Sequence, residues 1–282
     1  PQAMLPPPPD LSRRAPDYEP RELFYIVKHG IKFTGMPAWP SQSRDDEVAA
    51  VVAFLRVLPG LDGAAYSKLV LGDEPRTDAL GELADGERPP PAIVASCARC
   101  HGHDGNGRGS AAVPKLAGQR AAYLLGALQA YAHGQRPSGV MQPLAAAIPP
   151  PELGELAAYY SQLPARSRQS DTRDAAHAVQ GAPSAAELAG RGRTIAHEGI
   201  LERRVPACVD CHGPGPARRS APAPRLAGQY ADYLVLQLQL FSARTRGGSP
   251  HAALMDEVAP RLTHQQMREV AAYYGSLPPS RD

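Results

Sequence analysis

The sequence has few aromatic residues, almost no net charge and no long apolar run. Phe, Trp and Tyr make up 6% of its 282 residues, whereas there are 31 Pro and 26 Gly. This composition favours small domains rich in loops over a large sheet. Lys and Arg total 30 against 28 Asp and Glu, so there is no broad basic field to bind a nucleic-acid backbone. We therefore expect no nucleic-acid partner.

No apolar stretch is long enough to cross a membrane. A spanning helix needs roughly 20 apolar residues, and the longest candidate, 48–55, is flanked by Glu47 and Arg56. The sequence begins without Met and without a charged-then-apolar leader, so we expect a processed product or part of a longer chain. Paired carboxylates, an activated nucleophile and a dinucleotide fingerprint are also missing, which gives no sign of separate enzyme chemistry.

All four cysteines lie in two C-x-x-C-H pentapeptides, at 97–101 and 208–212. This spacing is typical of c-type haem attachment, because two thiols add to the porphyrin vinyl groups and the adjacent His is placed under the iron. A four-cysteine zinc site and a thioredoxin-like redox pair are the alternatives. Zinc does not need a His after each second Cys, and the redox pair needs a βαβ context that the sequence does not show. We predict two covalently bound haem c groups, attached to Cys97, Cys100, Cys208 and Cys211.

The surroundings of the two motifs also recur, which a chance pentapeptide would not produce. PKLAGQ at 114–119 returns as PRLAGQ at 224–229, an offset of 110 (224 minus 114). AAYY at 157–160 returns at 271–274, an offset of 114 (271 minus 157). These repeats predict two homologous domains.

A methionine occupies the same position in each copy. Met141 stands 23 residues before Pro164 (164 minus 141), and Met255 stands 23 residues before Pro278 (278 minus 255). A neutral thioether is a suitable sixth ligand for haem iron and raises its reduction potential. Core filling is the usual role of a single Met, but the repeated interval favours ligation here. Met267 instead belongs to an apolar stripe, and we expect it in a core.

A first unit has the methionine and the closing helix but no preceding C-x-x-C-H. The same interval separates Met36 from Pro59 (59 minus 36), so Met36 is predicted to be equivalent to the other two methionines. The intervals from His to Met in the other copies are 40 (141 minus 101) and 43 (255 minus 212). They would place a motif before residue 1. We hypothesise a third haem whose motif has been lost, removed or lies outside this sequence. His29 is a conceivable substitute ligand, although a lone exposed His more often has no such role.

Each unit is predicted to end in one amphipathic helix. Apolar residues recur there at steps i, i+3, i+4, i+7 and i+10, which places them on one face. These residues are Val48, Val51, Val52, Leu55 and Leu58; Leu153, Leu156, Ala157, Tyr160 and Leu163; and Met267, Val270, Ala271, Tyr274 and Leu277. Thr263 and Gln266 are predicted to form a capping box. All three helices are predicted to stop at a Leu-Pro pair, because Pro lacks the N–H that would continue them.

The residues resemble the class I c-type cytochromes. The stretches that carry the resemblance are CARCHGHDGNGR at 97–108, CVDCHG at 208–213, the two LAGQ loops and the two methionines. Residues 73–282 look like the two-domain dihaem branch, and 22–59 is similar to the later half of single-haem relatives. The resemblance implies all-α tandem domains with loop-rich haem pockets, electron transfer, and export to the bacterial periplasm.

The predicted domains follow from the repeats and the resemblance together. Residues 1–72 are the C-terminal half of a cytochrome c domain lacking its C-x-x-C-H, while 73–168 and 185–282 each contain one. The acid-rich stretch 73–88 and the polar stretch 166–184 are predicted connectors.

The resemblance also implies roles for individual residues. His101 and Met141 would be the axial ligands of the first iron, and His212 and Met255 those of the second. The carbonyls of Pro114 and Pro224 would accept a hydrogen bond from the unligated nitrogen of each His. Candidates for contacts to the haem propionates, with ordinary surface roles as the alternative, are Gln119, Tyr123, Arg136, Gln229, Tyr233 and Arg244.

These expectations together predict an electron carrier rather than an enzyme. An iron with His and Met on its two faces offers no vacant position to substrate, so the site passes electrons. We expect a redox protein as donor and another as acceptor. One alternative is an electron-transfer subunit of a membrane-associated dehydrogenase or oxidase complex. Another is a haem peroxidase in which one Met does not bind.

Overall fold

The computed structural model describes residues 7–71, 91–107, 112–166, 183–214, 223–248 and 251–279. Within these ranges the chain forms helices joined by loops, with one isolated bridge between Ile200 and Val205 and no sheet. The predicted all-α class is confirmed. The connectors predicted at 73–88 and 166–184 lie outside the described residues, apart from the ends of the second. No helix in the described part has the length and apolarity needed to cross a membrane.

The chain divides into two compact units. Unit 1 combines Pro1–Thr77 with Tyr131–Ala147, and unit 2 combines Asp78–Ala130 with Ile148–Asp282. Both C-x-x-C-H motifs belong to unit 2, whereas the segment that carries Met141 packs with the beginning of the chain in unit 1. The division into three domains stays a prediction.

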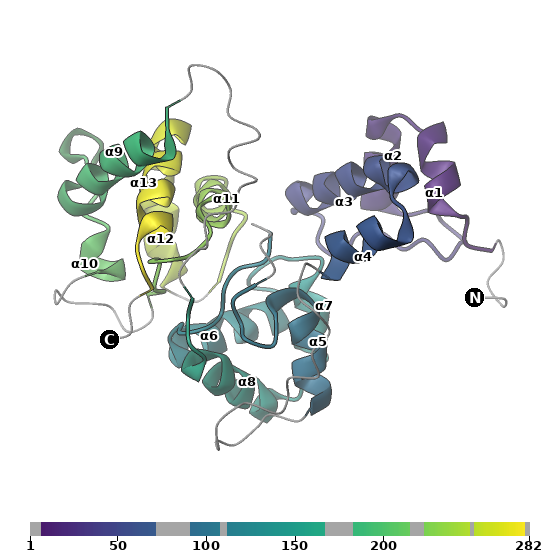
Figure 1. Cartoon of the computed structure of the whole chain (residues 1–282), viewed down its shortest axis with the longest axis horizontal. Helices are drawn as coiled ribbons and strands as arrows, with labels where there is room; N and C mark the ends of the chain where they lie inside the picture. Colours follow the sequence, from purple (N-terminus) through teal and green to yellow (C-terminus); the bar gives the residue numbers. More distant parts are fainter. Residues whose placement is uncertain are drawn as a thin grey trace. The chain divides into compact units, whose positions relative to one another are not determined.

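Unit 1 is built around two packed helices. Leu23 and Val27 of one helix meet Val48, Val52 and Leu55 of the other in a buried cluster. The stripe predicted for the first closing helix therefore faces the core of its unit. The helical segments of unit 1 (Figure 1) are α1 Leu11–Arg14, η1 Ala15–Asp17, α2 Pro20–His29, α3 Asp45–Val57, η2 Leu58–Gly60, α4 Gly63–Leu71 and α7 Met141–Ala146.

Unit 2 contains both motif-bearing copies. Its helical segments are α5 Pro91–His101, α6 Ala121–Ala132 (the last two residues of which belong to unit 1), α8 Pro150–Gln162, α9 Ala185–Glu198, η4 Leu201–Arg203, α10 Val209–His212, α11 Ala231–Ser242, α12 Ala252–Val258, η5 Ala259–Arg261 and α13 His264–Ser276. In the second copy α13 lies beside α9 and also packs on α11 (Figure 1). The apolar stripes predicted on α8 and α13 are buried except for Leu277, which is half-buried, and Met267 is 1% exposed in a core, as predicted.

The ends of α9 and α13 are set by local capping. The predicted capping box of α13 is confirmed, because Thr263 Oγ1 accepts from the Gln266 N–H at 3.2 Å and Gln266 Oε1 accepts from the Thr263 N–H at 2.9 Å. Ser184 and Glu187 form the same device at the start of α9. Gly199 ends α9 with φ of 71°, a conformation that costs glycine little.

The crossing of α9 and α13 depends on one glycine. A Cβ added at Gly192 would lie 1.9 Å from the Glu269 carbonyl oxygen, far closer than two such atoms can approach. Gly190, on the same helix, is exposed, and a Cβ there would meet nothing within 4 Å. Of these two glycines of α9, Gly192 is the one at which the packing leaves no room for a side chain.

We expect Gly192→Ala to lower the free energy of unfolding by ~1–3 kcal/mol, because overpacking forces the two helices apart. Gly190→Ala is the matched control and should raise stability by ~0.5–1 kcal/mol, since alanine favours an exposed helix interior. Denaturant unfolding of the purified variants measures both values. Equal stability changes in the two variants would contradict the proposed close crossing.

Candidate functional site

The first motif forms the last turn of α5. Cys97, Cys100 and His101 are spaced i, i+3 and i+4, which places all three on one face of a helix. The Cys97 side chain packs against the core around Leu156 and Tyr160, whereas Cys100 is exposed and His101 is 7% exposed. The motif therefore has one thiol at the core, one thiol at the surface and a buried imidazole.

The second motif repeats this arrangement on α10. Cys208 is the residue at the N-terminal end of the short helix, and Cys211 and His212 close it. Cys208 packs against the core around Tyr274, and Cys211 is exposed. Gly213, with φ of 71°, then turns the chain away. The Tyr274 hydroxyl donates to the Gly213 carbonyl at 2.9 Å, which fastens this turn to α13.

Both histidines are oriented by a proline carbonyl. His101 Nδ1 donates to the Pro114 oxygen at 3.1 Å, and His212 Nδ1 donates to the Pro224 oxygen at 2.9 Å. A carbonyl can only accept, so this contact fixes the proton on Nδ1 and leaves the Nε2 lone pair available to a metal. Burial lowers the pKa of both histidines, only partly offset by these hydrogen bonds. The neutral, ligating form is favoured.

The thiols do not have the properties of a redox pair. Burial raises the pKa of the Cys97 thiol, with the nearby Cys100 adding to the effect, and burial raises the pKa of Cys208 to about 11. Thioredoxin-like motifs need the opposite shift, because the thiolate is their nucleophile. The described residues also contain no group of three or more His, Cys, Asp and Glu side chains that could hold a metal ion. Neither the redox pair nor the four-ligand zinc site is favoured by this geometry.

The residues present fit a haem group. A neutral imidazole and a thioether are suitable axial donors for haem iron, and each motif offers two free thiols for covalent attachment. Met141 begins α7 and Met255 lies in α12, both half-buried. Exposed apolar side chains stand beside them, including Val140 at 45% and Leu254 at 63%. Such surface is what a porphyrin ring would cover.

Two glutamines join the two copies reciprocally. Gln119 Nε2 donates to the Arg225 carbonyl at 3.0 Å, and the Arg225 N–H donates to Gln119 Oε1 at 2.9 Å. Gln229 makes the equivalent pair with the backbone of Lys115, at 3.0 Å in both directions. Each side chain thus bonds the residue that follows the histidine-binding proline of the other copy. These amides connect the two sites, and their predicted contact to propionates stays a prediction.

Further side chains cross between the two copies in unit 2. The Tyr230 hydroxyl donates to the Asn106 carbonyl at 2.9 Å, and the Lys115 ammonium lies 5.0 Å from the centre of the Tyr230 ring. Arg246 donates to the Tyr123 hydroxyl at 3.1 Å. The tie between the copies therefore extends beyond the glutamines.

One arginine in each copy is buried over an aromatic ring. Arg136 is 6% exposed and lies 4.5 Å from the centre of the Tyr131 ring; Arg246 is 7% exposed and lies 4.8 Å from that of Phe241. Phe241 and Arg246 follow Tyr131 and Arg136 by 110 positions (241 minus 131 and 246 minus 136), which is also the offset between the two LAGQ loops. Arg246 is therefore the repeat equivalent of Arg136. The propionate contact predicted for Arg244 stays a prediction. The offset of the LAGQ loops, extended past the glutamine, identifies Arg246 as a further residue of this kind.

The remaining predicted residues lie in varied surroundings. Arg244 is exposed, 3.5 Å from Glu257, and Tyr233 packs against the core of the second copy. Met36 is 37% exposed in the loop after α2, where its carbonyl accepts from the Ile31 N–H at 2.9 Å. His29, at the end of α2, is exposed.

Family models match most of the chain. The model described as "Cytochrome c" matches residues 91–159 and 189–278, and the model described as "Cytochrome C oxidase, cbb3-type, subunit III" matches residues 2–55. Together they cover each of the three predicted units.

Individual relatives match the region with the two motifs. The "Thiosulfate dehydrogenase electron acceptor" of Stutzerimonas stutzeri is 36% identical over 202 residues, or 70% of this chain and 88% of that protein. Cytochrome c4 of Thiocapsa roseopersicina is 31% identical over 208 residues, covering 73% and 98%. The crystal structure of cytochrome c4 from Pseudomonas stutzeri has a TM-score of 0.55 at 30% identity, covering 66% of this chain and 95% of that one. Thiosulfate dehydrogenase from Marichromatium purpuratum has a TM-score of 0.54 at 37% identity, covering 64% of this chain and 36% of that one.

We expect Gln229→Ala to destabilise unit 2 by ~1–3 kcal/mol, because it leaves the backbone N–H and C=O of Lys115 without their partner. The control is Gln162→Ala, an exposed glutamine at the last position of α8, which should change stability by less than ~0.5 kcal/mol. Calorimetric unfolding measures the loss and shows whether the two copies begin to unfold separately. An unchanged transition for Gln229→Ala would rule out this reciprocal tie.

Proposed function

The chain belongs to the cytochrome c family, and on that premise we propose that it is a dihaem electron carrier that serves a dehydrogenase. The protein is an electron-transfer cytochrome, with the cytochromes c4 among its relatives. Haem c bound at the two motifs supplies an iron that gains and loses one electron. This chain's own residues attach, orient and shield that group.

The observation that carries the proposal is the pairing of the two histidine sites. Each motif histidine is held through Nδ1 by the proline at the start of an LAGQ loop, and each loop is bonded to the other by a glutamine. The two sites therefore belong to one bonded unit. A relay between two redox centres needs such a fixed relation, because electron transfer is efficient only when little rearranges.

We assign the axial positions to His101 and Met141 in the first copy and to His212 and Met255 in the second. The common spacing of the methionines and the neutral donor set support this assignment. If these residues bind each iron as proposed, they would leave no coordination position for added peroxide, which favours an electron carrier over a peroxidase.

A third haem at Met36 remains part of the proposal. Its support is the repeated interval to the closing Leu-Pro and the family match over residues 2–55. Its attachment motif is not in this sequence. Mass spectrometry of the natural protein counts the haems and tests the point.

The partner we propose is a dehydrogenase in the bacterial periplasm, with a second redox protein as the final acceptor. Two relatives, at 36% and 34% identity, are named as electron acceptors of thiosulfate dehydrogenase. A permanent place in a membrane-associated complex is the alternative form of the same function. Purification with and without detergent distinguishes the two.

We expect Met141→Ala and Met255→Ala each to convert one ferric haem to high spin and to lower its reduction potential, because the thioether favours the reduced iron. Met267→Leu is the control: its side chain is buried in a core, so the spectra should stay as in the wild type. Absorbance of the methionine-to-iron charge-transfer band and a redox titration measure both effects. Unchanged spin state and potential in the two alanine variants would overturn the ligand assignment.

We expect the oxidised protein to be reduced rapidly by a thiosulfate dehydrogenase when thiosulfate is present, and both haems to be reduced. Stopped-flow absorbance with enzyme alone and thiosulfate alone as controls measures the rate. Reduction no faster than in these controls would argue against this partner class. Rapid turnover of peroxide by the wild-type protein would instead favour the peroxidase.

A further inference from the structure

Trp39, Arg44 and Glu47 contact the segment 137–141, which carries Met141. The Glu47 carboxylate, at the start of α3, accepts from the Ser138 hydroxyl at 2.7 Å and from the Gly139 N–H at 2.6 Å. It also accepts from Trp39 Nε1 at 3.0 Å and pairs with the Arg44 guanidinium at 3.0 Å. Its side chain is 13% exposed. Charge-assisted bonds to a carboxylate shielded in this way are among the stronger polar contacts in proteins.

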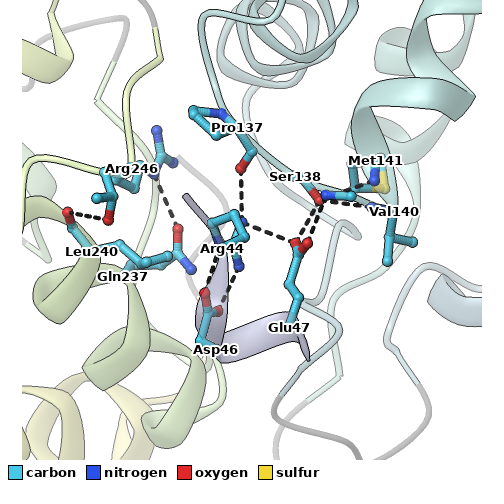
Figure 2. A network of polar contacts seen from close by, with 12 residues as sticks. Arg44, Asp46, Glu47, Pro137, Ser138, Val140, Met141, Gln237, Leu240 and Arg246 are labelled. Carbon is cyan, nitrogen blue, oxygen red and sulfur yellow. Dashed lines mark hydrogen bonds and ion pairs between the residues drawn. The ribbon is translucent and has the colours of Figure 1, made fainter. Parts of the chain in front are cut away.

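Arg44 forms the second contact to the same segment. Its guanidinium donates twice to the Asp46 carboxylate, at 2.8 Å each, and once to the Pro137 carbonyl at 2.8 Å (Figure 2). The bidentate pair with Asp46 fixes the plane of the guanidinium, so that its third nitrogen, Nη1, faces Pro137 and Glu47. Pro137 and Ser138 are thus held by two adjacent, mutually paired charges.

Ser138 connects Glu47 to the backbone of the methionine. Its hydroxyl donates to Glu47 and accepts from the backbone N–H of Met141 at 3.0 Å and of Val140 at 3.3 Å (Figure 2). Ser138 is 3% exposed. The backbone at the start of α7 is therefore tied to α3 through one hydroxyl.

The fit of Gly139 against Trp39 is independent evidence for this contact. A Cβ at Gly139 would lie 2.1 Å from Trp39 Nε1, so the indole can occupy its place only beside a glycine. Counting back from the methionine, the second copy has Ala252 and Ala253 where the first has Ser138 and Gly139. Ser138 and Gly139, which bond Glu47, therefore have no counterpart at the same distance before Met255 in the second copy.

We propose that Glu47, acting through Ser138, is a positioning residue that holds Met141 on the iron of the first haem. This inference rests on the function proposed above. A methionine sulfur can leave the iron, and an external ligand such as imidazole can then replace it. When the backbone that carries the methionine is restrained, the sulfur leaves the iron less often. The first haem thus keeps its methionine more firmly than it would without the N-terminal residues, and the two haems become inequivalent.

The test uses the full-length protein loaded with haem. Glu47→Gln replaces one acceptor oxygen with an NH2 group that faces donors, and Ser138→Ala removes the hydroxyl without changing charge. We expect imidazole to displace methionine from one ferric haem about tenfold more readily in either variant, equivalent to ~1.4 kcal/mol. We also expect the reduction potential of that haem to fall. Met141→Ala identifies which titration wave belongs to the first copy.

Asp45→Asn is the matched control. Asp45 is near Glu47 on α3 but pairs with Lys28 at 2.5 Å and is 60% exposed. The substitution Asp45→Asn removes one negative charge from the same helix turn as Glu47 without changing a contact to the segment 137–141. Imidazole affinity and the reduction potentials of both haems should therefore stay at wild-type values. Loss of the Glu47 charge by itself would raise a nearby potential, which is opposite to the fall expected from a loosened methionine.

The inference is supported if Glu47→Gln and Ser138→Ala affect the first haem alone and in the same direction. It is overturned if neither variant changes imidazole affinity, if both haems change equally, or if Asp45→Asn has the same effect. Failure of the proposed function is a separate outcome: the wild type itself would then lack the methionine charge-transfer band at the first haem.

Discussion

The hydrogen bond from each motif histidine to a proline carbonyl is the contact on which the rest of the arrangement depends. It fixes the protonated nitrogen of His101 and His212 and leaves the opposite nitrogen available for iron. The two prolines also begin the LAGQ loops that Gln119 and Gln229 bind together. A change in one histidine's support therefore reaches the contacts of the other copy.

The two methionine segments are held differently. Two alanines stand three and two positions before Met255 on α12 of unit 2. The same positions before Met141 hold Ser138 and Gly139, which bond the N-terminal residues in unit 1. We infer that the N-terminal residues contribute to electron transfer through the first haem, whatever Met36 itself binds. They supply a carboxylate that restrains the methionine ligand of that haem, so that two sites related by one repeat acquire different properties.

Features that depend on local spacing could be predicted from the sequence. The two C-x-x-C-H motifs, the apolar stripes of the closing helices and the capping box at Thr263 each lie within one short segment, so periodicity reveals them. The buried role of Met267 followed from the same stripe. The offset between the LAGQ loops also identifies Arg246 as the repeat equivalent of Arg136, whereas the propionate contact of Arg244 stays a prediction.

Features that depend on contacts between distant segments could not be predicted in this way. Gln229 bonds the backbone of a residue 114 positions away, and nothing in its own segment distinguishes that role from a contact to haem. From the sequence, Glu47 is indistinguishable from any other acidic residue in the first turn of a helix, where the helix dipole favours negative charge. Its bond to Ser138, 91 positions away, arises only from packing.

Near-infrared magnetic circular dichroism of the oxidised protein reports the pair of axial ligands at each low-spin ferric haem. We expect histidine–methionine coordination at both haems attached to this chain. A bis-histidine signal, or a high-spin iron at either site, would contradict it.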